Sequence, residues 1–321
     1  MILHELLREG TGFSPHYEPV SNSDHLPMVL AAMSGLGATD SQLRGFRDTY
    51  VTRLHRAPAA PEIEHWQQGI GRLDAYPSVM NWFGDRIDQV GVVSTLAETL
   101  PGFLPGLAID AFHPIIRLGY AVDFDCPEEV AAALACLTIV HHEIPISEAA
   151  VDLRQLVSAQ TAAGAISFVE NRFGPSILEL VRNGTYPVGR ALDFQTIARI
   201  SLDLYRSTRN FFALHLVTAT QALRCLLQDD SKNPDLEIMA NSSMTGALLA
   251  AHLVLGSPKI LSDALPAPRQ LDPEHCYKYV WACVCEYRRY SDADYLSEIA
   301  LFREQGLVPD WVARDLFDNT D

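Results

Sequence analysis

Residues 125–140, DCPEEVAAALACLTIV, carry the pattern that decides the fold. Apolar side chains recur there at a spacing of three or four residues, at Val130, Leu134, Leu137 and Val140. This spacing is the period of an α-helix that buries one face. Pro127 suits the first turn of such a helix, and Asp125 is a candidate cap before it, as Asp40 is before the helical segment SQLRGF (41–46). The stretch therefore predicts a helix packed against other helices.

The same spacing extends in both directions from this stretch, for example over residues 26–33 and 43–54. Turn-forming sequences such as GLGATD (35–40) and LPGFLPG (100–106) separate the periodic segments. Alternating patterns of period two are missing, which disfavours sandwiches, barrels and doubly wound sheets. Pro and Gly are scattered rather than pooled in a linker, and no fixed repeat is present. We predict one all-α domain over residues 1–321, with about a dozen or more helices.

Composition narrows the class of protein further. The chain has 321 residues, of which 48% are apolar, so it can bury a large core. Its net charge of −16 and the lack of a Lys/Arg cluster disfavour nucleic acid as a partner. No run reaches the ~20 apolar residues of a membrane helix, and residues 1–10 do not resemble a signal peptide. We expect a cytoplasmic protein with no membrane partner, whose six cysteines are reduced.

The eleven histidines fall into groups according to their neighbours. Four have polar or irregular surroundings and are interpreted as surface residues: His4, His16, His55 and His65. Four others adjoin strongly apolar helical segments: His25, His113, His215 and His275. Any one of these is ordinarily a hydrogen-bonded core residue. Metal sites of helical proteins use side chains from facing helices, so scattered positions are compatible with a site without demonstrating one.

Several motifs together resemble one known family. In chain order they are NSDHLPMVLAAMSGLGA (22–38), AYPSVMNWFGDRIDQVG (75–91), AFHPIIRLGYA (111–121), RNFFALHLVTATQALR (209–224) and PEHCYKYVWACVCEY (273–287). The ordered set resembles the questin oxidase-like family from about residue 14 to about residue 300. AFHPIIRLGYA and LHLVTATQALR are its most specific pieces.

This resemblance implies a metal-dependent oxidoreductase of aromatic polyketide metabolism. The family includes fungal oxygenases that open anthraquinone rings and a Baeyer-Villiger oxidase. A relative holds non-haem iron with four histidines and a carboxylated lysine, which here would be His25, His113, His215, His275 and Lys278. The expected activity is that of a mono- or dioxygenase that uses Fe(II) and O2 on a polycyclic aromatic substrate. Two departures concern Asp24, which replaces a common Asn, and the shorter chain, in which lid segments can differ.

Lys278 is one of only three lysines, and it lies three residues after His275, on the same face of a helix. A charged ammonium has no lone pair and cannot coordinate a metal. Burial near a cation lowers the pKa of a lysine, and the free amine can add CO2 to give an anionic carbamate. The alternative is a lysine whose stem packs on apolar groups while its amine reaches solvent.

Other residues near these motifs have two interpretations each. Arg117, four residues after His113, either steers a phenolate or carboxylate substrate or pairs with an acid such as Asp123 or Glu129. Asp24 either holds the His25 imidazole or caps its helix. Arg209 and Asn210 precede the segment of His215 and are candidates for hydrogen bonds that orient the ligands.

Competing sites are weaker. His252 has the local context of a ligand but is interpreted as a core or pocket residue. The triplet HHE (141–143) resembles a fragment of a diiron helix, yet Pro145 ends the helix there. Sequences such as GxSxG, a P-loop or HExxH are missing, and GLGATD is too incomplete for a dinucleotide site.

Alternatives to the leading hypothesis remain at this point. One is a Baeyer-Villiger type oxidase of the same substrates that uses NADPH as an external reductant. Another is a helical protein that binds such ligands without turnover. A third, hydrolysis at zinc with a carboxylated lysine, is disfavoured because such enzymes use barrels. A homodimer is left open.

Overall fold

The computed structural model describes residues 2–17, 22–59, 61–142, 144, 150–151, 173–227, 234–260 and 271–317. Twelve α-helices dominate this part of the chain. They are α1 (Ile2–Gly10), α2 (Leu26–Gly35), α3 (Asp40–Tyr50), α4 (Tyr76–Phe103), α5 (His113–Asp123), α6 (Pro127–Val140), α8 (Phe173–Arg182), α9 (Phe194–Thr208), α10 (Phe211–Leu226), α11 (Pro234–Val254), α12 (Pro273–Tyr290) and α13 (Ala293–Glu304).

Short elements connect these helices. The 3₁₀ turns are η1 (Val51–Arg53), η2 (Trp66–Gly69), η3 (Leu73–Ala75), η4 (Leu104–Gly106), η5 (Ile109–Phe112) and η6 (Arg314–Leu316). The strands are β1 (His16–Tyr17), β2 (Asn22–Ser23), β3 (Ala150–Val151) and β4 (Val188–Gly189). β1 pairs antiparallel with β2, with His16 opposite Ser23, and β3 pairs parallel with β4. The prediction of an all-α fold with about a dozen helices is confirmed.

The opening stretch forms α6, which begins at Pro127 and ends at Val140 as its pattern predicts. The predicted caps were wrong by one residue. Cys126 occupies the cap position of α6, while Asp125 has a left-handed backbone with φ 49°. In α3 the cap is Thr39 rather than Asp40, because Thr39 forms a reciprocal capping box with Gln42.

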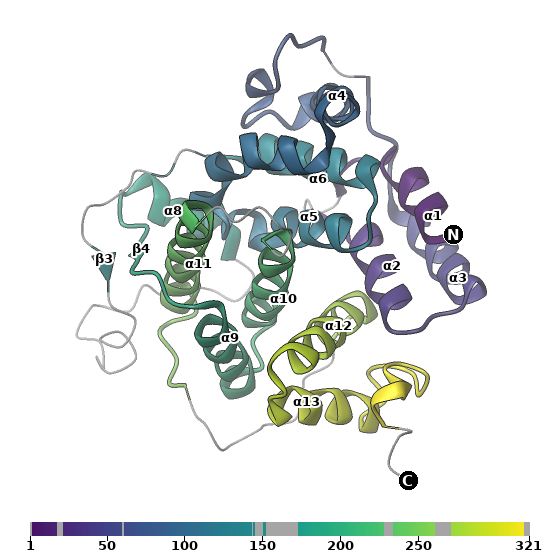
Figure 1. The fold of residues 1–321 in the computed structure, drawn as a ribbon, viewed down its shortest axis with the longest axis vertical. Coiled ribbons are helices and arrows are strands. Elements are labelled where there is room, and N and C mark those ends of the chain that lie inside the picture. Colours follow the sequence, from purple (N-terminus) through teal and green to yellow (C-terminus); the bar gives the residue numbers. More distant parts are fainter. Residues whose placement is uncertain are drawn as a thin grey trace.

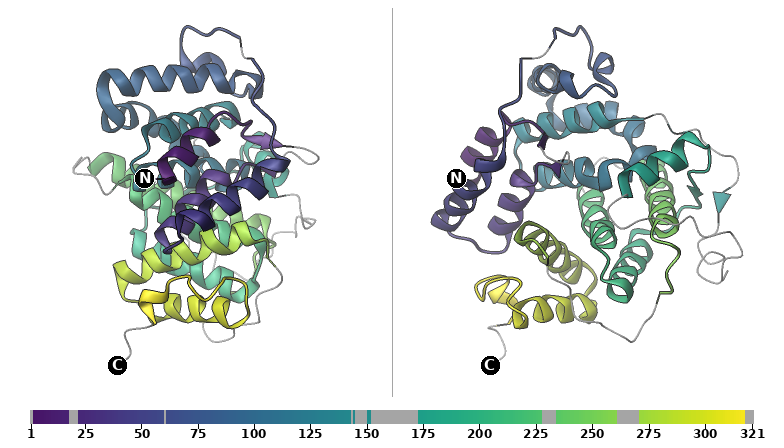
Figure 2. Two further views of the ribbon diagram at one scale, coloured as in Figure 1. Left: turned by 90° about the vertical axis from the view of Figure 1, so that its right-hand side faces the viewer. Right: turned by 180° about the vertical axis from the view of Figure 1, so that it is seen from behind.

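The helices follow one another in layers along the long axis of the molecule (Figure 1). α4 lies at one end, followed by α6 and then α5, while α12 and α13 lie toward the opposite end. Figure 2 shows the same order from the side and from behind, with the C-terminus at the end opposite α4. One large apolar cluster runs through these layers, from Met28 in α2 to Ala313 after α13. Within the described ranges, no helix has the length and apolar character that would let it cross a membrane.

Four central helices form a closed circuit of contacts. α2 packs on α5, α5 on α10, α10 on α12, and α12 on α2. The approach of α5 to α10 is close, since a Cβ on Gly119 would lie 2.5 Å from the carbonyl oxygen of Ala222. Each of these helices carries one of the predicted histidines at or near its N-terminal end. The circuit therefore brings together side chains that lie 250 residues apart in the chain, from His25 to His275.

Candidate metal centre

The four predicted histidines meet inside this circuit of helices. His25 precedes the first residue of α2, His113 is the first residue of α5, and His275 lies in the first turn of α12. His215 lies one turn into α10. Their rings form a closed ring of four, with centroid separations of 4.7 Å (His25–His113), 4.8 Å (His113–His215), 5.1 Å (His215–His275) and 4.7 Å (His275–His25). We call this set the four-histidine cluster.

Hydrogen bonds fix which nitrogens of two of these rings carry a proton. Nδ1 of His113 lies 2.7 Å from the carbonyl oxygen of Asp110, and Nδ1 of His215 lies 2.9 Å from that of Phe211. A carbonyl oxygen can only accept, so both Nδ1 atoms donate and both Nε2 atoms carry lone pairs. These two Nε2 atoms lie 3.2 Å apart. Two lone pairs at this distance repel each other unless a cation lies close to both. The two Nε2 atoms are therefore placed as two ligands of one metal ion would be.

The other members of the site have no side-chain hydrogen bond within the part of the chain that the structure describes. Among the described residues, neither ring nitrogen of His25 or His275 has a hydrogen bond, and neither does Nζ of Lys278. Lys278 is 0% exposed and His275 is 2% exposed, so bulk solvent does not reach these side chains. Unpaired buried polar atoms are costly and call for an explanation such as a bound ion. Ligand atoms of His25, His113 and His275 all lie within 4.8 Å of one another.

The electrostatics of the site favour neutral side chains. Burial lowers the pKa of His25, His113 and His275 well below its usual range, and that of His215 to about 3. A charged Lys278 would lower the pKa of each ring further. Burial also lowers the pKa of Lys278 to about 7, although Glu274 opposes this shift. His25, His113 and His275 lie at the N-terminal end of a helix, whose positive end also disfavours imidazolium. Neutral imidazoles are the form that binds metals.

Comparison with known sequences places the chain in a family. A sequence profile described as questin oxidase-like matches residues 22–186, slightly more than half of the chain. The chain belongs to the questin oxidase-like family.

Individual relatives of this questin oxidase-like chain are fungal oxidases. A Baeyer-Villiger oxidase, mdpL, of Emericella nidulans is 27% identical over 135 residues, which are 37% of this chain and 30% of the relative. Questin oxidase of Aspergillus terreus is 26% identical over 137 residues, again 37% of this chain and 30% of the relative. The Baeyer-Villiger oxidase ptaJ of Pestalotiopsis fici is 26% identical over 141 residues, 38% of this chain and 31% of the relative. The chain thus matches about a third of the length of these relatives.

The questin oxidase-like match covers only part of the cluster. His25 and His113 lie within residues 22–186, whereas His215, His275 and Lys278 lie beyond them. The three later residues are joined to the site by the structure alone, through the ring contacts of His215 and His275 and the shared helix face of Lys278.

Two neighbouring candidates have structural partners in this questin oxidase-like chain. Oδ1 of Asp24 accepts the backbone N–H of Leu26 at 2.8 Å, so Asp24 caps the start of α2, while its Oδ2 has no hydrogen-bond partner among the described residues. Burial raises the pKa of Asp24 to about 6. Arg117 is 3% exposed and forms a bidentate pair with Glu129, one of the two acids considered above. This pair joins α5 to α6 and occupies the guanidinium that substrate steering would require.

Arg209 and Asn210 form the turn and the cap at the start of α10, the helix that carries His215. Arg209 has a left-handed backbone with φ 48° between α9 and α10, and its Nη2 donates to Glu298 at 2.9 Å. The amide oxygen of Asn210 accepts the N–H of Phe212 at 2.8 Å and caps α10. Both residues therefore set the start of α10, whose second turn holds His215.

Sequence reasoning missed two neighbours of the cluster. Glu274 is 6% exposed, and its Oε1 lies 3.6 Å from Nδ1 of His25 and 3.5 Å from Nη1 of Arg53. Its position next to His275 was visible, but adjacent helical residues point in different directions, so no pattern linked it to His25. His16 was interpreted as a surface residue, yet its ring lies 3.1 Å from a carboxylate oxygen of Asp110 and only 14% of its side chain is exposed.

The competing histidines lie outside the four-histidine cluster. Nε2 of His252 lies 3.0 Å from the carbonyl oxygen of Pro258, at the end of α11. α6 ends at Val140, and the ring of His141 packs on Phe103 at 5.5 Å. The third residue of the HHE triplet, Glu143, lies outside the described residues. The interpretation of His141 as a helix-end residue is confirmed.

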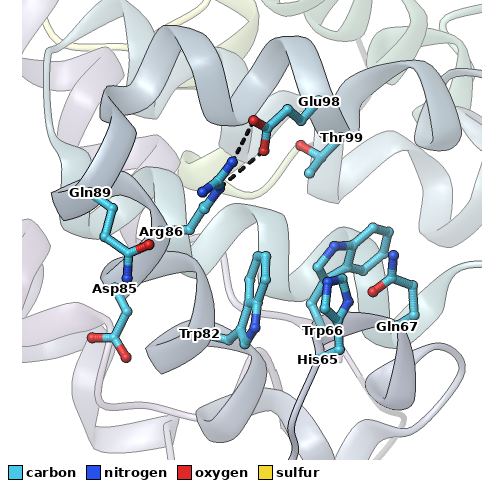
Figure 3. A pocket seen from close by; sticks show the side chains of 9 residues that line it. All are labelled: His65, Trp66, Gln67, Trp82, Asp85, Arg86, Gln89, Glu98 and Thr99. Carbon is cyan, nitrogen blue, oxygen red and sulfur yellow. Dashed lines mark hydrogen bonds and ion pairs between the residues drawn. The ribbon is translucent and has the colours of Figure 1, made fainter.

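A separate cavity of about 460 Å³ lies at the bend of α4 (Figure 3). The bend occurs at Gly91, where φ is 84°. It allows Nε of Arg86 to donate to Glu98 at 3.0 Å, although a straight helix would separate these residues by about 18 Å. Trp66 and Trp82 supply aromatic walls. The residues described as lining this cavity include none of the four-histidine cluster.

Proposed function

We propose that this chain is a mononuclear non-haem iron oxygenase that uses O2 to oxidise or cleave a ring of a polycyclic aromatic polyketide such as an anthraquinone. One observation carries the proposal: four largely buried imidazoles surround one point with their nitrogen lone pairs unpaired or opposed. Membership of the questin oxidase-like family and the oxidase names of the relatives support the same class of reaction.

The residues present fit a metal ion. His25, His113, His215 and His275 would hold it, because their neutral imidazoles suit iron, copper and zinc. Among these metals, zinc has no redox chemistry, whereas several histidines with one carboxylate-type oxygen and an open position suit an iron that binds O2. When bound, iron would supply the redox chemistry that allows O2 to react with an aromatic ring. The apolar helices around the cluster exclude bulk water from such a reaction.

Lys278 would supply the fifth ligand after reaction with CO2. The neutral amine attacks the carbon of CO2, a nitrogen–carbon bond forms, and the nitrogen releases one proton. The product is a carbamate, which offers an anionic oxygen where an ammonium could offer no lone pair. Burial without a partner disfavours the ammonium form of Lys278, and the positive ends of the helices that begin at the cluster favour an anion there.

Metal content and O2 uptake test the proposal together. Protein reconstituted with Fe(II) should bind one iron per chain and consume O2 with a reduced anthraquinone as substrate. His113→Ala and His215→Ala should lower both iron occupancy and O2 uptake by more than about 100-fold, the upper end of losses seen for mere outer-shell partners. His252→Ala is the matched control, because it removes a buried histidine outside the cluster. Absence of stoichiometric iron, with oxidation intact in His113→Ala, would contradict the proposal.

A second candidate keeps the substrates and changes the reductant. Two of the relatives described above carry the name Baeyer-Villiger oxidase. The Baeyer-Villiger reaction inserts an oxygen atom beside a carbonyl group. In that case NADPH would serve as an external electron donor. O2 uptake that requires NADPH, with a lactone as product, supports this candidate, whereas uptake with the reduced substrate alone supports the first. Tight binding of the substrate without turnover in iron-loaded protein would point to a binding protein instead.

A further inference from the structure

The three residues before His113 have an unusual backbone. Asp110, Ala111 and Phe112 all lie in the left-handed region, with φ of 51°, 50° and 67°. This conformation costs L-residues roughly 1–2 kcal/mol each, and only Gly, Asn and Asp adopt it readily. A run of three persists only where surrounding contacts determine it, and such runs concentrate at functional sites.

This left-handed turn aims a main-chain acceptor at His113. The carbonyl oxygen of Asp110 lies 2.7 Å from Nδ1 of His113, which therefore carries the proton. The lone pair of Nε2 then points toward His215, 3.2 Å away. The opposite tautomer would place a hydrogen on Nε2, which needs a free lone pair to bind a metal.

The side chain of Asp110 fastens this turn to the N-terminal hairpin. One oxygen, Oδ2, lies 3.1 Å from Oγ of Ser23 and 3.1 Å from Nε2 of His16. His16 and Ser23 face each other across β1 and β2, so the two donors reach the carboxylate from paired strands. We call these three residues the Asp110 bracket.

Ser23 also contacts the imidazole directly. Its Oγ lies 3.2 Å from Nδ1 of His113. Because a carboxylate only accepts, the hydroxyl hydrogen of Ser23 points to Asp110, and an oxygen lone pair is left facing the N–H of His113. Two acceptors, the Asp110 carbonyl and the Ser23 hydroxyl, thus bind the same N–H from two elements.

We propose that Asp110, Ser23 and His16 are positioning residues that fix the tautomer and the orientation of His113 for metal binding. The role in metal binding rests on the proposed function, whereas the fixed tautomer of His113 does not. Partners of this kind typically change metal affinity by about 10–100-fold when they are removed.

The first experiment needs no metal. In metal-free protein with nitrogen-15 histidine, the side-chain spectrum should show His113 as a single Nδ1–H tautomer, assigned by the signals missing in His113→Gln. An Nε2–H tautomer, or a mixture of the two, would overturn the proposal even if the chain binds no metal.

The second experiment measures affinity for Co(II), a spectroscopic substitute for Fe(II), by competition with a chelator. Asp110→Asn replaces the charged acceptor shared by Ser23 and His16 with a neutral amide, whose hydrogen bonds are weaker, but keeps a residue that tolerates the left-handed backbone. Asp110→Asn and Ser23→Ala should each weaken Co(II) binding by about 10–100-fold and shift the visible spectrum of the bound Co(II). Ser23→Thr keeps the hydroxyl and should therefore have the affinity and the spectrum of the wild type.

The matched control is Ser201→Ala, which removes a fully buried hydroxyl that meets Thr220 at 3.4 Å between α9 and α10 and takes no part in the Asp110 bracket. It should leave Co(II) affinity within about twofold of the wild type. If the wild type binds Co(II) and Asp110→Asn and Ser23→Ala bind it with the same affinity, the role of the Asp110 bracket is refuted while the proposed function stands. Failure of the wild type to bind Co(II) or Fe(II) would refute the proposed function, and the tautomer experiment would still decide the positioning of His113.

Discussion

At the scale of single residues, Lys278 combines full burial with an amine that has no hydrogen-bond partner among the described residues. Burial lowers its pKa from 10.5 to about 7, so the unfolded chain binds more protons than the folded chain between these two values. Stability must therefore rise with pH across this window. The buried amine of Lys278 therefore costs free energy in the metal-free protein.

Lys278→Met should stabilise the metal-free protein at pH 7 by on the order of 4 kcal/mol, because a pKa unit corresponds to about 1.4 kcal/mol. The gain should shrink toward zero near pH 10.5, the ordinary pKa of the amine. Urea unfolding in buffer free of metal and CO2 measures the difference. Lys259→Met, at an exposed lysine, is the control variant. A destabilised Lys278→Met variant would mean that the amine has a stabilising partner.

Arg209 illustrates a buried charge whose role is structural. Its partner Glu298 is 0% exposed and also accepts from the hydroxyl of Tyr279 at 2.9 Å. Arg209→Ala should destabilise the protein by about 3 kcal/mol, because it leaves this carboxylate buried without its main counter-charge. Arg288→Ala breaks an exposed ion pair with Asp315 and should cost less than about 1 kcal/mol. Equal losses in thermal unfolding of the two variants would contradict this assignment.

At the scale of helices, the distance between α5 and α10 sets the separation of His113 and His215. Gly119→Ala would drive a methyl group into the backbone of Ala222, where the available distance is 2.5 Å. We expect a loss of about 1–3 kcal/mol, typical of overpacking, and weaker metal binding because the two helices must separate.

Gly84→Ala provides the comparison in α4, since a methyl group there meets no atom within 4 Å. It should stabilise the protein by about 0.5–1 kcal/mol and leave metal affinity unchanged. Calorimetry together with metal titration separates the two effects. Unchanged metal affinity in Gly119→Ala would show that α5 and α10 do not set the geometry of the cluster.

At the scale of the whole molecule, the four-histidine cluster joins helices from both halves of the chain. A metal at 100 times its dissociation constant should add about 2.7 kcal/mol of stability and raise Tm by about 4 °C. Hydrogen exchange should show added protection in α2, α5, α10 and α12 together, because one ion would link all four. Protection confined to one helix, or no change in Tm, would argue against a shared site.

The amino-acid sequence by itself determined the class of fold and the candidate ligands. Helical periodicity is a local property, so α6 could be predicted from residues 125–140 with its start at Pro127. Caps were less predictable, because Thr39 and Asp40 both have side chains that can cap and only the backbone conformation decides between them. His113 and His275 could be named from motifs, but their proximity could not.

Only the tertiary structure decided which side chains meet. The contacts of α2, α5, α10 and α12 bring four histidines into one ring, and packing between distant helices has no signature in local spacing. The same holds for Asp110, whose left-handed backbone and bonds to His16 and Ser23 depend on a hairpin some 90 residues earlier. Periodicity encodes which face of a helix is buried, whereas the partner of that face is set by the packing of the whole chain.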